Sequence, residues 1–372
     1  MIVASCSASI AFVSTSIIYN CTKHILHVRG AVDLKIAVCG CGWSGSLLSV
    51  KLPEYGSVDV YEQDKKPKIV CGCGIPISTL RALASNFNLN AEDYVLWKTR
   101  TFVANIEGQV VNVTLSNLCT FDKERFMQDI IAQSAATFHF GEKLVIQHTS
   151  EYDLVVDASG KRALLGRLST DDVLSCFQAR ARFKELPHDG FYCEFSDINT
   201  GGYLWMFPLS EKEANVGCSA YNGAYSFQEV QKYLKRHDAQ VLEEGAKSSR
   251  LNPPHESLPF YAGNVVGVGE SVGAITRLGE GNELSAKCVE LFLRNFGKPK
   301  QYVKEVFKEL GWLKDDHALH KAMRDNKKLK MLYHALKVQR IYRERFQINE
   351  NAARVFAFLT VLRKSVLFTL GL

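Results

Sequence analysis

Apolar positions divide the chain into an early part where strand and helix patterns alternate and a late part with only helical spacing. Residues 34–39 form an apolar run with the length of a buried strand. A glycine-rich turn, a helical segment over 46–52 and a second strand at 58–62 follow it. The run 153–160 is another apolar strand, and it ends in small residues. This order predicts a parallel sheet covered by helices.

A block rich in strand-forming residues interrupts this alternation. The segment 101–116 alternates around Glu107-Gly108 and predicts a hairpin, and 191–221 continues the strand-rich pattern. The run 264–269 then predicts one more buried strand, followed by a helix from about residue 280 to residue 296. We therefore expect an α/β fold, in which a doubly wound, Rossmann-like nucleotide-binding domain is interleaved with an antiparallel-sheet substrate domain and followed by a C-terminal helical segment.

The same patterns define the expected domain boundaries. The first residues are rich in Ser and Thr and have no basic start, so we interpret them as a disordered or mis-assigned extension, with a signal peptide or membrane anchor as the alternative. The expected ranges are 1–32 for this extension, 33–75 with 120–175 and 262–297 for the nucleotide-binding domain, 76–119 with 176–261 for the substrate domain, and 298–372 for the C-terminal segment.

Charge and cysteine usage narrow the class of protein. The formal net charge is +6, and the segment 298–345 alone holds 14 Lys and Arg against 6 Asp and Glu. A local basic face of this kind does not predict nucleic-acid binding. The 11 cysteines are odd in number and irregularly spaced, which is not the pattern of a disulfide-stapled secreted domain and favours a cytoplasmic protein.

Two pairs of cysteines, Cys39 with Cys41 and Cys71 with Cys73, bring four thiols into consideration as metal ligands. Their C-x-C spacing is a poor match to the C-x2-C spacing of structural zinc sites. The first pair also flanks a glycine that the next motif requires. We expect no metal site.

The glycine-rich turn has the form G-x-G-x-x-G, and it lies between a strand and a helix as a dinucleotide-binding loop requires. Gly40 permits the tight turn, Gly42 lets the backbone approach a pyrophosphate, and Gly45 lets helix and strand pack closely. Glu62 ends the next strand, 17 residues after Gly45, where a carboxylate can accept hydrogen bonds from ribose hydroxyls. These residues predict a dinucleotide site.

Four separated segments resemble the flavoprotein geranylgeranyl reductase family, which is related to the flavin-dependent aromatic hydroxylases. They are the glycine-rich loop with its acid, the strand 153–160, the pair 268–273 and 279–282, and the signature Tyr203-x-Trp205-x-Phe207-Pro208. The last of these is the most selective. The resemblance covers residues 33–297, and it implies noncovalently bound FAD.

The resemblance also implies which residues form the site. The cofactor-binding residues would be Gly40, Gly42, Gly45, Glu62, Lys123, Asp157, Gly269, Glu270, Gly279, Gly281 and Asn282, and the catalytic residues would be Cys71, Tyr203, Trp205 and Phe207. Three residues depart from the family pattern: Glu270 replaces Asp, Arg277 replaces Pro and Lys123 replaces Arg.

Two of these assignments leave alternatives open. Tyr203, Trp205 and Phe207 alternate, so on a strand they share one face, which suits an apolar polyprenyl chain or simply an aromatic core. Cys71 is expected to act as a proton donor or flavin gate, or else to be an inert buried thiol.

The implied reaction is the saturation of C=C bonds in a geranylgeranyl-type chain, carried on a diphosphate or an ether-lipid precursor. The electron donor would be NAD(P)H, ferredoxin or a deazaflavin. The alternatives are a flavin-dependent aromatic hydroxylase or halogenase and, in another class, a non-catalytic flavin- or lipid-binding protein.

The C-terminal segment predicts peripheral contact with a membrane. Its basic stretch precedes residues 352–372, which are largely apolar but carry three cations and therefore make a poor transmembrane helix. Such a segment can lie in the bilayer interface. The alternative is that its helically spaced apolar residues pack on the body of the protein.

Overall fold

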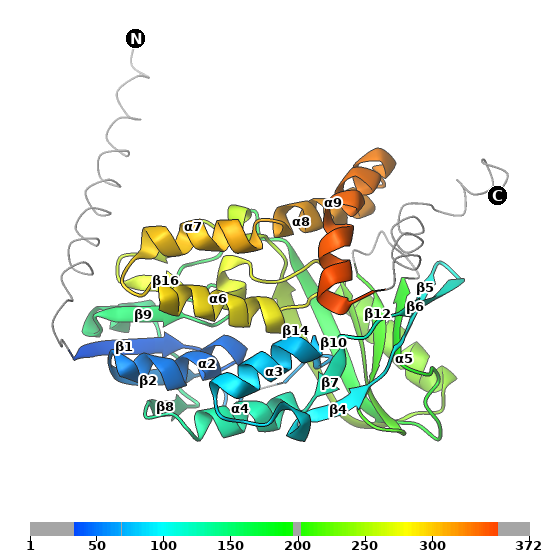
Figure 1. The fold of residues 1–372 in the computed structure, drawn as a ribbon, viewed down its shortest axis with the longest axis horizontal. Coiled ribbons are helices and arrows are strands. Elements are labelled where there is room, and N and C mark those ends of the chain that lie inside the picture. Colours follow the sequence, from blue (N-terminus) through cyan, green and yellow to red (C-terminus); the bar gives the residue numbers. More distant parts are fainter. Residues whose placement is uncertain (1–32, 68, 196–201, 349–372) are drawn as a thin grey trace, which may run out of the picture.

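Two large sheets organise the protein (Figure 1). The computed structural model describes residues 33–67, 69–195 and 202–348. The predicted extension 1–32 and the apolar stretch 352–372 lie outside the described residues. Among the helices that the structure does describe, none is both long enough and apolar enough to cross a membrane.

The first sheet has six strands in the order β15-β16-β9-β1-β2-β8. All neighbouring pairs are parallel except β15 with β16, as the continuous apolar runs predict. The last four residues of β1 are all buried. The strands are β1 (Leu34–Cys39), β2 (Gly56–Glu62), β8 (Thr137–Phe140), β9 (Leu154–Asp157), β15 (Tyr261–Ala262) and β16 (Val265–Gly267).

Helices cover one face of this sheet. On that face α2 (Trp43–Lys51) packs against α4 (Lys123–Ile131) and α6 (Asn282–Arg294), and α6 packs against α7 (Pro299–Leu310). The Asp122 side chain caps α4 by accepting from the N–H of Arg125. The opposite face is covered by a smaller cluster that includes Leu144, Tyr152 and Leu164, because the segment between β8 and β9 is too short to add a long helix.

The second sheet has seven strands in the order β14-β10-β13-β12-β11-β5-β6. The predicted hairpin is confirmed as β5 paired with β6. The other pairs are antiparallel as well, except that β5 runs parallel to β11. The strands are β5 (Thr101–Ile106), β6 (Gln109–Thr114), β10 (Val173–Arg182), β11 (Phe191–Phe195), β12 (Leu204–Pro208), β13 (Glu213–Ala220) and β14 (Gln240–Arg250).

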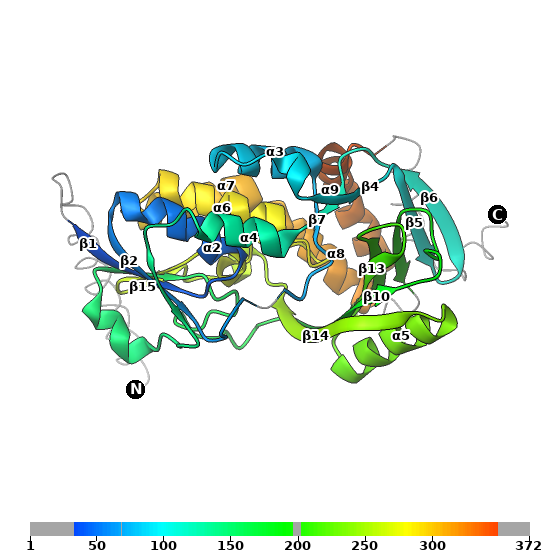
Figure 2. The same ribbon diagram turned by 90° about the horizontal axis from the view of Figure 1, so that it is seen from below.

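Helices lie on both faces of the second sheet (Figure 2). On one face, α5 (Gly223–Arg236) packs against β10 and β13. On the other, α8 (Leu313–Arg324) and α9 (Lys328–Phe346) share a core with the sheet. Residues of β12 alternate between the two cores, since Met206 faces α5 and Trp205 faces α8 and α9.

A small third sheet joins the two large ones, with β7 (Cys119–Phe121) between β3 (Gly74–Ile75) and β4 (Val95–Lys98), and α3 (Ile77–Asn86) leads from β3 toward β4. The chain leaves the six-stranded sheet after β2 and after β9, and it returns at β8 and at β15. The sheets are therefore interleaved along the sequence. The residue boundaries predicted for the two domains stay a prediction.

Candidate active site

The glycine-rich loop joins β1 to α2. Gly40 has a φ of +98°, and its N–H donates to the carbonyl of Tyr61 over 2.8 Å. A Cβ at Gly45 would lie only 1.9 Å from the Gly40 carbonyl oxygen, whereas a Cβ at Gly42 would meet nothing within 4 Å. Gly45 therefore serves packing, and Gly42 leaves open space beside the first N–H groups of α2, which have no partner within the helix.

Glu62 is already oriented toward this loop. One carboxylate oxygen accepts from the N–H of Cys41 at 2.9 Å, and the other accepts from the N–H of Asp64 at 3.1 Å. The side chain is half-buried, so lone pairs stay available for ribose hydroxyls. Loop and acid together fit the phosphate and ribose of a dinucleotide.

Two of the predicted cofactor-binding residues, Asp157 and Gly269, contact other parts of the protein itself. The fully buried Asp157 carboxylate accepts from the hydroxyl of Ser159 at 2.6 Å and from the N–H groups of Leu164 and Leu165 at 2.9 and 3.1 Å. Gly269 has a φ of +76°, and a Cβ there would meet the Ser44 hydroxyl. Both residues hold the segments around the loop together, and their direct contact with a cofactor stays a prediction.

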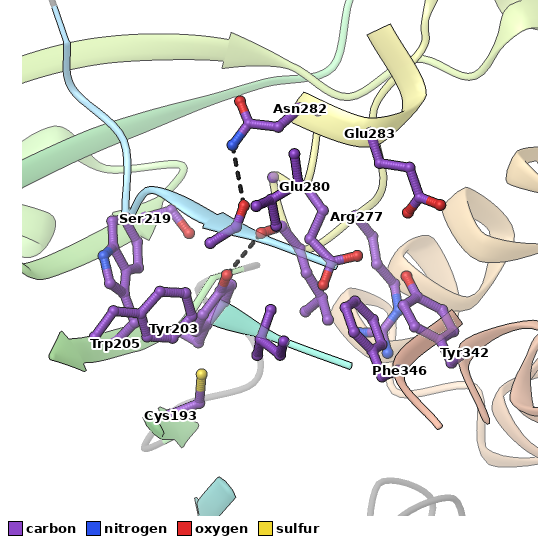
Figure 3. Close-up of a pocket in the computed structure, with 18 of the residues that line it drawn as sticks. Cys193, Tyr203, Trp205, Ser219, Arg277, Glu280, Asn282, Glu283, Tyr342 and Phe346 are labelled. Carbon is purple, nitrogen blue, oxygen red and sulfur yellow. Dashed lines mark hydrogen bonds between the residues drawn. The ribbon is translucent and has the colours of Figure 1, made fainter. Parts of the chain in front are cut away.

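One pocket of about 240 Å³ brings most of the other predicted residues together (Figure 3). The lining includes Cys71, Lys123, Tyr203, Trp205, Phe207, Glu270, Gly279, Gly281 and Asn282. The remaining lining is mostly apolar, and most of it comes from strands of the seven-stranded sheet and from α8 and α9. The pocket thus connects the predicted flavin contacts with an apolar space between the seven-stranded sheet and the C-terminal helices.

Asn282, the first residue of α6, organises the polar end of this pocket. Its side chain accepts from the ammonium of Lys123 at 2.8 Å and donates to the carbonyl of Gly74 at 3.0 Å. Its own carbonyl accepts from the indole N–H of Trp43 at 2.7 Å. Lys123 is therefore held in the position where the family resemblance places an arginine.

Cys71 and Cys73 lie in the loop between β2 and β3. The Cys71 sulfur accepts from the N–H of Cys73 at 3.3 Å and from the Asn282 amide at 3.7 Å. Hydrogen bonding from Cys73, together with the positive charge of Lys123, holds the pKa of Cys71 well below its usual value, although burial opposes this. The pKa of Cys73 is raised. Cys71 is therefore the more readily ionised thiol of the pair.

Glu270 faces a residue that the sequence did not single out. The Lys247 ammonium on β14 lies 3.7 Å from its carboxylate, and this charge raises the pKa of Lys247. Glu270 is partly exposed, and ideal Cβ atoms at Gly160 and Gly281 would lie 3.4 and 3.0 Å from its oxygens. The absence of side chains at those glycines leaves the carboxylate room to reach ribityl hydroxyls.

The three aromatic residues of the signature form one wall of the pocket. Tyr203 and Trp205 have ring centroids 5.5 Å apart, and Phe207 continues the row. The Tyr203 hydroxyl donates to the carbonyl of Leu278 at 2.6 Å, which fixes its ring (Figure 3). The Trp205 indole N–H is buried and has no hydrogen-bond partner among the described residues. This unpaired donor in a pocket wall fits a bound polar group.

The wall opposite is supplied by α9, with Tyr342 and Phe346 across from Tyr203 and Trp205 (Figure 3). Arg345 turns back into the pocket and pairs with Glu280 at 3.2 Å and with Glu283 at 2.7 Å. Burial raises the pKa of Glu280 even so. Nothing in the sequence pattern indicated that the end of the basic segment reaches the site.

Arg277, which stands where the family has proline, has a structural partner of its own. Its N–H donates to the Asp316 carboxylate at 2.7 Å, and its guanidinium lies 3.2 Å from the same side chain. The arginine at position 277 therefore holds α8 beside the pocket through Asp316. As for metals, no group of three or more His, Cys, Asp or Glu in the described ranges could hold an ion.

Comparison with known proteins gives a family match and a relative of similar length. The family model "Geranylgeranyl reductase catalytic domain" matches residues 172–253, which span β10 to β14. An uncharacterized protein of Methanocaldococcus jannaschii is 25% identical over 334 residues, which cover 74% of this chain and 89% of that protein.

Solved structures share the fold. A geranylgeranyl bacteriochlorophyll reductase-like protein from Thermoplasma acidophilum has a TM-score of 0.65 and 16% identity, covering 91% of this chain and 98% of that one. A flavin-dependent halogenase from Xanthomonas campestris has a TM-score of 0.58, 15% identity and 77% coverage of both chains. A probable FAD-dependent monooxygenase from Pseudomonas aeruginosa has a TM-score of 0.55 and 15% identity, covering 79% of this chain and 97% of its own.

These likenesses confirm the predicted mixed α/β fold. At these identities the solved structures show a shared fold, and the family match concerns residues 172–253. The resemblance to the geranylgeranyl reductase family that the motifs predicted is confirmed as a similarity, because the family model matches residues 172–253.

Proposed function

We propose that this protein is an FAD-dependent reductase that saturates C=C bonds of a geranylgeranyl-type chain, carried on a diphosphate or an ether-lipid precursor. The observation that carries the proposal is the single pocket, which runs from the predicted flavin contacts at Glu270 and Asn282 into an apolar space between the seven-stranded sheet and α9. An isoprenoid chain has the apolar, flexible character that such a space accommodates.

FAD would be held at two places. The loop around Gly42 and the Glu62 carboxylate fit its pyrophosphate and ribose, and the start of α6 with Glu270 fits its ribityl chain and flavin ring. When bound, the reduced flavin supplies a hydride to one alkene carbon. The long cofactor explains why two distant glycine-rich segments belong to one site.

The chain's own residues would position the alkene and exclude water. An isolated C=C bond offers no hydrogen-bonding group, so orientation has to come from the shape of the apolar walls. Trp205 and Phe207 on one side and Phe346 on the other provide such walls. The other alkene carbon requires a proton. Water or a side chain such as Cys71, which lines the pocket, would supply it.

The test is a product assay with FAD-reconstituted full chain. Enzyme reduced by dithionite is incubated with geranylgeranyl diphosphate, and the products are examined by mass spectrometry for successive additions of two hydrogens. We expect such additions. The Cys71→Ala variant distinguishes the two proton sources: slower additions would indicate the thiol, and additions at the native rate would indicate water. A sample that shows no flavin absorbance after reconstitution would overturn the proposal at its first step. NADPH, ferredoxin and a deazaflavin are then compared as donors.

A second candidate, an aromatic hydroxylase or halogenase, is favoured by the structural likeness to proteins of those classes. Its signature would be NADPH oxidation stimulated by a phenol, without any hydrogenated isoprenoid. A third outcome would be a flavin that binds but is not reduced by dithionite or any donor, which would indicate a non-catalytic flavin-binding protein.

A further inference from the structure

The helix α9 carries two apolar stripes on opposite sides. Its inner stripe, with Met331, Ala335 and Val338 buried, packs against the seven-stranded sheet and α8. Its outer stripe consists of Leu329, Leu332, Tyr333 and Leu336, which are 84, 39, 55 and 55% exposed. The spacing i, i+3, i+4, i+7 places these four side chains together on one face of the helix.

Exposed large hydrophobic side chains are concentrated in the outer stripe. Among the described residues 13 large hydrophobic side chains are exposed, and 4 of them fall within these eight positions of α9. Isolated exposed leucines need no explanation, but an exposed apolar stripe on one helix indicates an interaction surface. Figure 1 shows the first part of α9, drawn in orange, at the edge of the molecule.

Cations surround this stripe. The helix α9 contains six Lys and Arg and one Glu. Lys328 and Lys330 flank the stripe at its start and are exposed. Lys337 lies over the Tyr333 ring at 4.5 Å while its ammonium reaches Asp315, so its stem adds to the apolar surface. An apolar face with cations beside it complements an anionic lipid surface.

We infer that the outer stripe of α9 docks on an anionic bilayer surface. Leu329, Leu332 and Leu336 enter the headgroup region and the neighbouring lysines face lipid phosphates and carboxylates. A second copy of this chain is a poorer occupant, because a symmetric contact would bring two cationic helix faces together. The inference is independent of the proposed reaction, since it stands on exposure and charge alone. If the substrate is an isoprenoid lipid, docking brings one wall of the pocket to the phase that dissolves it.

The first test measures co-sedimentation of the full chain with phosphatidylcholine vesicles that contain or lack phosphatidylserine. We expect binding to the anionic vesicles that weakens as salt rises. Leu329→Glu/Leu336→Glu should reduce this binding by about tenfold or more, since it removes inserted apolar groups and adds negative charge. The matched control is Val110→Glu/Val241→Glu on β6 and β14, where the side chains are 63 and 41% exposed; it should bind within about twofold of the native chain.

A second measurement locates the contact. Tyr333→Trp should show a blue shift of the added tryptophan emission on anionic vesicles, and quenching by brominated lipid. Circular dichroism checks that each variant folds. An undiminished Leu329→Glu/Leu336→Glu variant, an equal loss in the control, or an unshifted Trp at 333 would each overturn the inference. So would a native dimer, seen by sedimentation velocity, that Leu329→Glu/Leu336→Glu splits, because the stripe would then join two copies.

Discussion

The glycine-rich loop and the pocket are the two parts of the proposed FAD site, and they are built in different ways. The loop lies within six consecutive positions, and backbone contacts such as Gly40 N–H to the Tyr61 carbonyl define it. The pocket instead assembles side chains from Cys71 to Phe346, and its hydrogen bonds join residues far apart in sequence. Backbone-built sites leave a local sequence pattern, whereas a pocket built from distant side chains does not.

Trp43 links the two regions. It belongs to the G-x-G-x-x-G motif, yet its indole N–H donates to the carbonyl of Asn282, 239 residues later. The position directly after Gly42 is free of the motif's own requirements, so the chain uses it for the contact between α2 and α6. A change confined to the loop should therefore be separable from a change that breaks the long-range contacts.

The largest effect is expected for Gly45→Ala. The added Cβ would lie 1.9 Å from the Gly40 carbonyl oxygen, and both atoms are fixed by backbone. We expect the free energy of unfolding to fall by about 3 kcal/mol or more, or folding to fail. Urea denaturation of the FAD-free chain measures this. Stability within experimental error of the native chain would show that the loop is not packed as described.

The same substitution three positions earlier should act on the ligand alone. At Gly42 the Cβ meets nothing within 4 Å and φ is −72°, so Gly42→Ala should change the stability of the FAD-free chain by less than about 1 kcal/mol. Because the methyl group would occupy the space for the pyrophosphate, FAD affinity should fall by about tenfold or more. Fluorescence titration with FAD gives the affinity, and unchanged binding would contradict a phosphate site here.

A long-range contact on the pocket side is tested by Asp172→Asn. Asp172 lies at the start of β10 and accepts from His317 of α8 at 2.9 Å. Burial alone would raise its pKa, but hydrogen bonds from His317 and Tyr221 outweigh burial and lower the pKa to about 2. The stabilisation is therefore present above the unfolded pKa of about 4 and is lost as pH falls from about 4 toward 2.

We accordingly expect Asp172→Asn to lose about 2 kcal/mol at neutral pH and to show a flatter dependence of stability on pH between about 4 and 2. Urea denaturation across that range is the measurement. Asp189→Asn, at an exposed position of the loop between β10 and β11, is the control and should follow the native profile. If the free energy of unfolding of Asp172→Asn changed with pH as it does in the native chain, the carboxylate would not be holding α8 in place.

The smallest effect concerns the polar end of the pocket. Since the pKa of Cys71 is lowered by Cys73 and then by Lys123, alkylation of Cys71 by iodoacetamide should reach its plateau at a lower pH than an ordinary thiol with a pKa of about 9. Lys123→Met should move the profile to higher pH and slow the reaction at neutral pH by about threefold. Peptide mass spectrometry follows this one cysteine. Lys66→Met, which removes an exposed lysine, should leave the profile in place.

Much of the architecture could be predicted because it rests on local pattern. The run at β1, the hairpin of β5 and β6 and the alternation along β12 all follow from side-chain periodicity and turn residues. Helix ends were placed less well: α2 begins at Trp43 rather than at residue 46, and α6 ends at Arg294 rather than at residue 296. Helix ends depend on which residues later pack against them, and periodicity does not report this.

By itself, the sequence determined the glycine-rich loop, its acid and the aromatic signature, because each is encoded in a few neighbouring positions. Only the tertiary structure decided that Lys247 faces Glu270, that Asp316 fastens Arg277, and that the end of α9 closes the pocket. These contacts join positions that lie far apart in the sequence. In the sequence alone, a lysine or arginine that turns inward cannot be told from one on a solvated face. Which cations turn inward depends on where buried carboxylates lie, and only the folded chain brings the two together.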